Sequence, residues 1–205
     1  MKILFFHILE LNIFFKEMKR LAVFASGSGT NFQQICEYFK EKNSDIKIEL
    51  LVVNKANAYV VERAKQLNVK SVYFNREDFY SSDKVVECLL ENQIDFIVLA
   101  GFLWLVPSNI LKNYENKIIN IHPALLPKYG GKGMHGHHVH QAVIAAKEQE
   151  SGITIHYVNE KYDEGNIIFQ AKCSITPEDT ADSLAEKIHL LEKEHFPKVI
   201  DNLLS

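Results

Sequence analysis

Asn120 and His122 are the pair of side chains whose types and spacing best suit catalysis. They fall on or beside the apolar run 118–121, which predicts a buried strand, and a spacing of two along an extended chain directs both side chains to one side. An Asn amide donates two hydrogen bonds and a protonated imidazole donates as well, so the pair could polarise a carbonyl group or stabilise an oxyanion. The simpler interpretation is a hydrogen-bonded core amide beside a structural histidine.

A carboxylate could complete this pair. Asp163 lies in the turn sequence Tyr162-Asp163-Glu164-Gly165, where the glycine permits a sharp bend. Beside His122, the charge of Asp163 would raise the pKa of the imidazole. Taken alone, a carboxylate on a turn is usually solvated or caps a helix.

The loop 26–31, Ser-Gly-Ser-Gly-Thr-Asn, joins a predicted strand to a predicted helix. Its glycines let backbone N–H groups turn toward an anion, and the N-terminus of the following helix adds positive potential. The loop lacks the third glycine of a dinucleotide-binding fingerprint and the Gly-Lys-Ser/Thr of a triphosphate-binding loop, so we expect it to bind a single phosphate group. A tight turn with a Ser or Thr helix cap is the alternative.

Four histidines crowd one glycine-rich segment: His135, His137, His138 and His140. Their spacing could form a loose zinc site, but no second ligand cluster accompanies them and the three cysteines are distant in the sequence. We therefore expect a flexible, partly exposed loop and no bound metal. By its local sequence Glu192 is one more charged residue on the solvated face of a helix.

The elements that must position these residues alternate along the chain. Strands are predicted at 21–25, 46–53, 71–74, 95–99, 118–121, 152–158 and 167–175, and helices at 32–42, 59–67, 83–92 and 181–203. Apolar runs without alternation favour strands buried on both faces of a parallel sheet. The sequence predicts an α/β fold with a doubly wound, mostly parallel sheet, completed by a C-terminal hairpin and a closing helix. Ligands in such sheets bind beyond the carboxyl ends of the strands, so the segments 26–31, 101–106, 120–122 and 159–165 should converge.

Composition narrows the class of protein. The chain has 205 residues, of which 47% are hydrophobic and 24% charged, as in an ordinary globular protein that buries a core. A net charge of −3 provides no basic field to attract nucleic acid. Three widely spaced cysteines are typical of a reducing compartment, so we expect a cytoplasmic protein.

Residues 1–17 are apolar, but Lys2, Glu10 and Lys16 interrupt them and leave no uncharged run long enough to span a bilayer. No small-residue cleavage site follows, as a signal peptide would require. We predict that 1–17 is an upstream extension and that 18–205 is a single domain; a genuine extra element or targeting segment is the alternative.

Four segments resemble the phosphoribosylglycinamide formyltransferases, the folate-dependent glycinamide ribonucleotide transformylases of purine synthesis. They are SGSGTN at 26–31, LAGF at 99–102, NIHPALLPKY at 120–129 and SGITIHYVNEKYDEGNII at 151–168. The NIHP and TIH pieces are also similar to other enzymes that use 10-formyltetrahydrofolate, including methionyl-tRNA formyltransferase. The resemblance runs from residue 18 to the C-terminus and implies a Rossmann-like formyltransferase fold.

The resemblance also implies a role for each matching residue. The catalytic residues would be Asn120, His122 and Asp163. The residues binding the phosphate and ribose of the ribonucleotide would be Ser28, Gly29, Thr30, Asn31 and Glu192. The residues enclosing the folate would be Leu103, Trp104, Leu105, Val106, Asn120, Asn159, Glu160, Lys161, Tyr162 and Asp163. Leu103-Trp104 stands where many members have Met-Arg, and only Arg76 and Lys84 lie near a position that could meet the folate tail.

The implied reaction is transfer of the formyl group from 10-formyltetrahydrofolate to the amine of glycinamide ribonucleotide, giving formylglycinamide ribonucleotide and tetrahydrofolate in de novo purine biosynthesis. The folate is a co-substrate, no metal is needed, and the partners are small molecules, with no nucleic acid or membrane and a monomer or homodimer expected. The alternatives are a formyltetrahydrofolate deformylase, an enzyme like methionyl-tRNA formyltransferase, and a catalytically silent nucleotide- or folate-binding module.

Overall fold

The fold is built on a seven-stranded sheet with the strand order β3-β2-β1-β4-β5-β6-β7. The structure is a computed structural model that describes residues 18–205. The prediction for residues 1–17 concerns residues outside this range. The strands β1 to β5 pair in parallel, whereas β6 pairs antiparallel with both β5 and β7. The strands are β1 (Lys19–Ala25), β2 (Ile46–Val53), β3 (Lys70–Tyr73), β4 (Phe96–Leu99), β5 (Ile118–His122), β6 (Glu150–Tyr157) and β7 (Ile167–Ser174).

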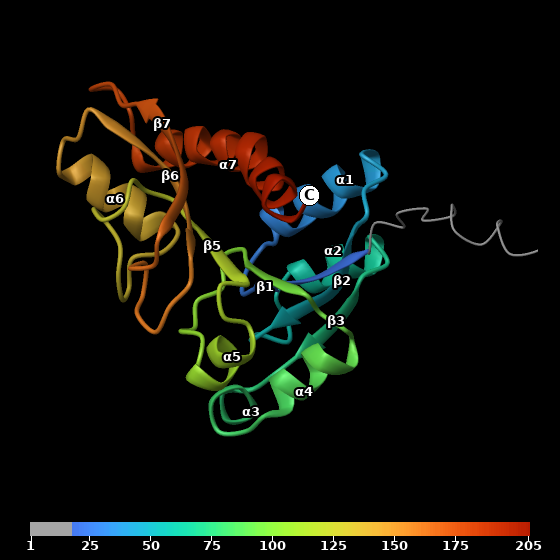
Figure 1. The fold of residues 1–205 in the computed structure, drawn as a ribbon. Helices are drawn as coiled ribbons and strands as arrows, with labels where there is room; N and C mark the ends of the chain where they lie inside the picture. Colours follow the sequence, from blue (N-terminus) through green and yellow to red (C-terminus); the bar gives the residue numbers. More distant parts are fainter. Residues whose placement is uncertain (1–17) are drawn as a thin grey trace, which may run out of the picture.

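Helices cover both faces of the sheet, and each face has its own apolar core (Figure 1). One core joins the sheet to α1 (Thr30–Glu41), α2 (Val60–Gln66), α6 (His137–Ala145) and α7 (Ala181–Leu204). The other joins it to α3 (Arg76–Tyr80), α4 (Lys84–Glu91) and α5 (Ser108–Asn113). Successive side chains of a strand point to opposite faces, so Val23 enters the first core and Phe24 the second.

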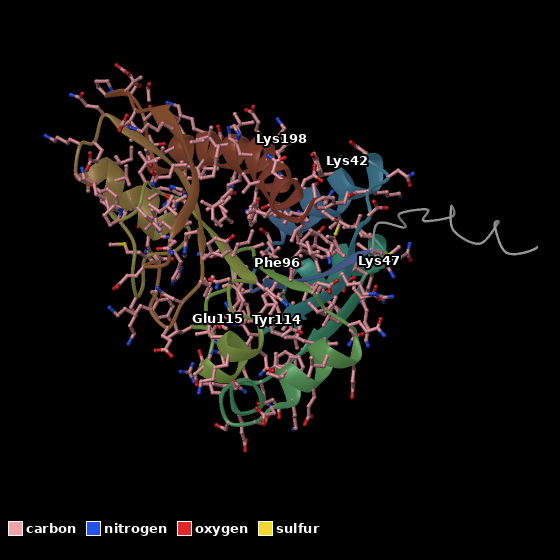
Figure 2. All side chains as sticks on the ribbon, in the orientation of Figure 1. Lys42, Lys47, Phe96, Tyr114, Glu115 and Lys198 are labelled. Carbon is pink, nitrogen blue, oxygen red and sulfur yellow. The ribbon has the colours of Figure 1, made fainter. Side chains whose placement is uncertain are left out.

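This double burial explains why β1 and β4 lack polar residues over most of their length. Figure 2 shows Phe96 and Tyr114 within the body of the molecule, while Lys47 and Lys198 lie at its periphery. Among residues 18–205, no helix combines the length and the apolar character needed to cross a bilayer.

The predicted α/β class and the doubly wound, mostly parallel sheet are confirmed. The predicted C-terminal hairpin of 152–158 and 167–175 is confirmed, since β6 and β7 pair with each other; β6 also pairs with β5, so the hairpin extends the main sheet. The short helices α3 and α5 were not predicted, because five or six residues carry too little periodicity to recognise.

The expectation of a flexible loop over residues 135–140 is wrong for 137–140, four of its six residues. Residues from His137 onward begin α6, whose Val139 and Val143 are buried in the core shared with α7. Four histidines concealed this helix, since the apolar residues that give it its buried side occur only at 139 and beyond. The packing against α7 supplies the stability that local propensity does not.

Candidate active site

A cleft of about 600 Å³ opens beyond the carboxyl ends of the parallel strands, where the strand order reverses between β1 and β4. The four segments expected to converge there all contribute to its walls: the 26–31 loop, residues 101–106, the end of β5, and the turn after β6. The strand register aligns the ends of β1, β4 and β5 at this edge of the sheet, because Phe24 pairs with Leu99 and Leu99 pairs with Asn120.

Asn120 is held by a cross-strand partner that the sequence analysis missed. The antiparallel register of β5 and β6 places His156 directly opposite Asn120. His156 Nδ1 donates to the backbone carbonyl of Tyr157 at 2.8 Å, which leaves the lone pair of Nε2 to accept from Asn120 Nδ2 at 3.1 Å. The orientation of the Asn120 amide is therefore fixed: His156 accepts from one Nδ2–H, and the other is directed toward Asp163 Oδ1 at 3.4 Å.

His122 is buried, at 3% exposure, at the end of β5. Its Nε2 lies 2.8 Å from the backbone carbonyl of Tyr129, which can only accept, so Nε2 carries the ring proton. Nδ1 faces Asp163 Oδ2 at 3.5 Å. Burial lowers the pKa of His122; Asp163 raises it, as expected, but burial outweighs this effect and the net shift is downward. Nδ1 is therefore a vacant proton site beside a carboxylate.

Asp163 is fixed by the turn that carries it. It adopts a left-handed backbone conformation with φ 57°, uncommon for a residue other than glycine, and its Oδ2 accepts from the backbone N–H of Gly131 at 2.9 Å. Burial disfavours the charged carboxylate, but the hydrogen bonds and imidazoles around it more than offset burial and lower the pKa of Asp163. We call Asn120, His122, His156 and Asp163 the catalytic corner, after the catalytic role predicted for three of them.

The 26–31 loop presents the N-terminus of α1 to the cleft. Gly29 precedes the helix with φ 77°, and no side chain caps the first turn, which leaves its N–H groups free for an anion. A methyl group on Gly29 would lie 2.3 Å from Val60 Cγ2, so only glycine fits there. Arg63 Nε donates to the carbonyl of Ser28 at 2.8 Å and braces the loop from outside. Lys55 adds a positive charge to the same wall.

Glu192 does not lie on a solvated helix face, as its local sequence suggested. It is 6% exposed and lines the cleft from α7. His189, one turn earlier, also lines the cleft and places Nδ1 3.0 Å from Glu192 Oε2. This contact raises the pKa of His189. The pair forms a polar part of the cleft wall, contributed by α7.

The other end of the cleft is apolar and aromatic. Leu103, Trp104, Leu105 and Val106 all line it, as do Lys161 and Tyr162 from the turn after β6. Asn159 and Glu160 are exposed and do not reach it, so the structure does not place these two predicted folate contacts in the cleft. Asn159 instead shapes the turn, because its Oδ1 accepts from the backbone N–H of Lys161 at 2.9 Å.

Trp104 belongs to an aromatic cluster, in which its ring meets Phe79 and Phe102 edge to face and is tilted against Tyr80. The guanidinium of Arg76 lies over the rings of Tyr80 and Trp104, at 5.1 and 5.8 Å from their centroids. Lys84, the other basic candidate for the folate tail, pairs with Asp78 at 2.5 Å.

The histidines at 135–140 do not gather into a metal site. Within residues 18–205 no group of three or more His, Cys, Asp or Glu side chains has the geometry to hold an ion. His138 is exposed, whereas His140 is buried and lines the cleft.

Sequence reasoning missed His156, His189 and the backbone carbonyl of Tyr129. The signal for His156 was available: Thr-Ile-His at 154–156 faces Asn-Ile-His at 120–122 once the strands are paired antiparallel. His189 lies one helical turn before Glu192, a spacing that brings two side chains together. Nothing local marks a carbonyl as a hydrogen-bond acceptor for a particular histidine.

Comparison with known proteins identifies relatives along most of the chain. The family model described as formyl transferase matches residues 19–200. The phosphoribosylglycinamide formyltransferase of Bacillus subtilis (strain 168) is 39% identical over 191 residues, which cover 91% of this chain and 95% of that protein. The chloroplastic phosphoribosylglycinamide formyltransferase of Arabidopsis thaliana is 38% identical over 182 residues, and the match spans 86% of this chain but 62% of the plant protein's length.

A solved structure agrees with these matches. Glycinamide ribonucleotide transformylase 1 from Geobacillus kaustophilus superposes with a TM-score of 0.84 at 41% identity, covering 92% of this chain and 100% of that one.

Proposed function

The chain belongs to the formyl transferase family, and from this premise we propose that it transfers the formyl group of 10-formyltetrahydrofolate to the amine of glycinamide ribonucleotide, a step of purine biosynthesis. The observation that carries the proposal is the catalytic corner, which joins an anion-binding loop to an apolar, aromatic pocket within one cleft. The matched relatives named for this activity support it.

The two ends of the cleft suit the two substrates. The free N–H groups at the start of α1, with Ser28, Gly29, Thr30 and Asn31 around them, bind the phosphate of the ribonucleotide. Glu192 accepts hydrogen bonds from the ribose hydroxyls. The flat pterin ring of the folate packs between residues 103–106 and the turn at 161–163.

The amine attacks the formyl carbon directly, so no covalent intermediate with the protein forms. A bond from the amine nitrogen to the formyl carbon replaces the bond from N10 of the folate, and one proton passes from the amine to N10. The Asn120 N–H that His156 does not use stabilises the developing oxyanion, a contribution of roughly 3–4 kcal/mol for one well-placed donor. The Asn120 Nδ2 contact with Asp163 Oδ1 is long, at 3.4 Å, and yields to a substrate oxygen.

His122 enters the reaction neutral, since burial lowers its pKa. Nδ1 accepts the proton that the amine loses, and the carboxylate of Asp163, 3.5 Å away, stabilises the resulting imidazolium. The imidazolium then returns the proton to the leaving nitrogen. Positioning both substrates in one cleft supplies much of the remaining rate acceleration.

The reaction is tested by following 10-formyltetrahydrofolate consumption by the full-length protein with and without glycinamide ribonucleotide. We expect consumption only when the ribonucleotide is present, with formylated ribonucleotide as product. Equal consumption without it would identify water as the nucleophile and the protein as a deformylase. Binding of both ligands without turnover would identify a silent binding module.

We also propose that residues 18–205 form a single formyltransferase domain and that 1–17 is an upstream extension. The family match to 19–200 supports this, and every proposed site residue lies between 28 and 192. A chain that begins at Met18 should fold and keep the kcat of the full-length protein. Aggregation or loss of activity would show that residues 1–17 are structural.

We propose that the protein is located in the cytoplasm, is a monomer or a homodimer, and has no nucleic-acid partner. Cys36, Cys88 and Cys173 are all free thiols, which suits a reducing compartment. Size-exclusion chromatography with light scattering measures the assembly; a mass above that of a dimer would contradict this proposal.

A further inference from the structure

His140 is a buried cleft residue that the mechanism does not use. It projects from the first turns of α6, is 4% exposed, and lines the cleft. Its Nδ1 is buried and has no hydrogen-bond partner. Such atoms also occur elsewhere in residues 18–205, in Gln34, Glu49, Asn54, Tyr114 and Ser151, but among them His140 is the one that borders the cleft.

An imidazole in this position needs an explanation. Burying a polar group without a partner costs free energy, and nearly all buried polar atoms in folded proteins are paired. Valine or leucine at 140 would satisfy the packing of α6 against α7 without that cost. A ligand in the cleft that accepts a hydrogen bond from Nε2, the ring nitrogen that is not enclosed, accounts for a histidine here and leaves the Nδ1 lone pair as the one unpaired site of the ring.

The protonation state of the His140 imidazole determines whether each ring nitrogen donates or accepts a hydrogen bond. Burial lowers the pKa of His140, so the imidazole is neutral and carries one proton. Leaving a lone pair unpaired in the interior is better tolerated than leaving an N–H unpaired, which puts the proton on Nε2 and not on the enclosed Nδ1. Nε2, at the tip of the ring, is the atom that a molecule in the cleft can reach, and it is a donor.

The position of His140 identifies the part of the ligand it meets. The α6 and α7 helices lie side by side (Figure 1), and the charges that act on His140 come from His189 and Glu192 on α7, His137 on α6 and His122 on β5. His140 is therefore close both to Glu192, assigned to the ribose, and to His122 of the catalytic corner. In glycinamide ribonucleotide, the group that links the ribose to the reacting amine is the glycinamide, and its carbonyl oxygen is the hydrogen-bond acceptor of that link.

We propose that His140 is a further substrate-binding residue, which donates a hydrogen bond from Nε2 to the glycinamide carbonyl and so orients the amine toward the formyl carbon. This inference rests on the proposed function and adds to it the residue that recognises the glycinamide group. It also explains how the cleft distinguishes the ribonucleotide from a simple sugar phosphate, because the phosphate and ribose contacts are common to both.

The test compares two ligands on matched variants. Affinities for glycinamide ribonucleotide and for ribose 5-phosphate, which lacks the glycinamide, are measured by calorimetry on the wild type, His140→Phe, His140→Gln and His140→Asn. His138→Phe, on the exposed side of the same helix, is the control. Glutamine extends an amide N–H to about the place of Nε2, whereas asparagine reaches only that of Nδ1, so the comparison of these two polar variants holds even if His140→Phe does not fold.

We expect His140→Phe to weaken binding of the ribonucleotide about tenfold, the effect of losing one hydrogen bond and stranding its acceptor. Binding of ribose 5-phosphate should change less than about twofold, and His140→Gln should recover more of the ribonucleotide affinity than His140→Asn. Equal losses for the two ligands, or no loss for the ribonucleotide, would overturn the assignment. A wild-type protein that binds no glycinamide ribonucleotide would overturn the proposed function together with it, whereas the other two outcomes leave the proposed function intact.

Discussion

The 26–31 loop and the catalytic corner line the same cleft but are built from different parts of the chain. The loop works through backbone N–H groups, and its shape depends on Gly29 and on the start of one helix. The corner works through side chains from β5, β6 and the following turn, each oriented by a hydrogen bond to another segment. In the proposed reaction, a local arrangement thus binds the substrate and a long-range arrangement performs the chemistry.

Because of this difference, substitutions in the two regions should change different kinetic constants. A change in the loop alters backbone geometry and should appear mainly in the KM for the ribonucleotide. A change in the corner removes a group that acts on the transition state and should appear mainly in kcat.

The largest effect is expected at the centre of the corner. His122→Ala removes the proton acceptor beside Asp163, so kcat should fall by about a thousandfold while the KM values stay within about threefold. Steady-state kinetics measure this, with thermal unfolding to verify the fold and His138→Ala as the control. Turnover near that of the wild type would remove His122 from the mechanism.

In the loop, Gly29→Ala should raise the KM for the ribonucleotide by roughly tenfold or more, with a smaller change in kcat. The added methyl group meets Val60 at 2.3 Å, and the left-handed backbone costs about 1–2 kcal/mol for any residue with a Cβ. Gly27→Ala is the matched variant, because a Cβ there meets nothing within 4 Å. If both variants raise KM equally, the fit against Val60 does not shape the phosphate site.

A supporting residue of the corner should give an intermediate loss. His156→Phe keeps the ring but removes the nitrogen that accepts from Asn120 at 3.1 Å, so the amide can rotate. We expect kcat to fall about tenfold, the effect of loosening a contact that orients a catalytic group. An unchanged kcat would mean that Asn120 is oriented without His156.

These two regions also differ in how far the sequence could predict them. The loop was recognisable because its glycines and its helix follow one another along the chain. Asn120, His122 and Asp163 could be named from motifs, but their supports could not, since the pairing of His156 depends on strand register and the Tyr129 carbonyl has no sequence signature.

The direction of the His122 pKa shift depended on burial as well as on charge. Asp163 was correctly placed beside the ring, yet the enclosure of His122 at 3% exposure outweighs it. In the same way, α6 was hidden because its contacts with α7 come from far along the chain.

The smallest effect concerns stability against pH. The pKa values of His122 and His140 are lowered by burial, so the unfolded chain takes up more protons as the pH falls through their ordinary value of 6.5. Their contribution to stability is therefore present above this pH and lost below it. His189, whose pKa is raised, has the opposite dependence.

Urea unfolding at about pH 7.5 and about pH 5.5 measures the change in the free energy of unfolding that results from these opposing contributions. His140→Gln should lose less stability on acidification than the wild type, whereas His138→Gln should follow the wild type. Identical losses in all three proteins would show that burial of His140 is not coupled to its protonation.

The most direct test of the catalytic corner is a double-mutant cycle, which measures from kcat how strongly His122 and Asp163 are coupled. If the two act as one proton-transferring unit across their 3.5 Å contact, His122→Ala combined with Asp163→Asn should be about as slow as the slower single variant. If the two losses instead multiply, each residue acts alone and the catalytic corner is not the unit described above.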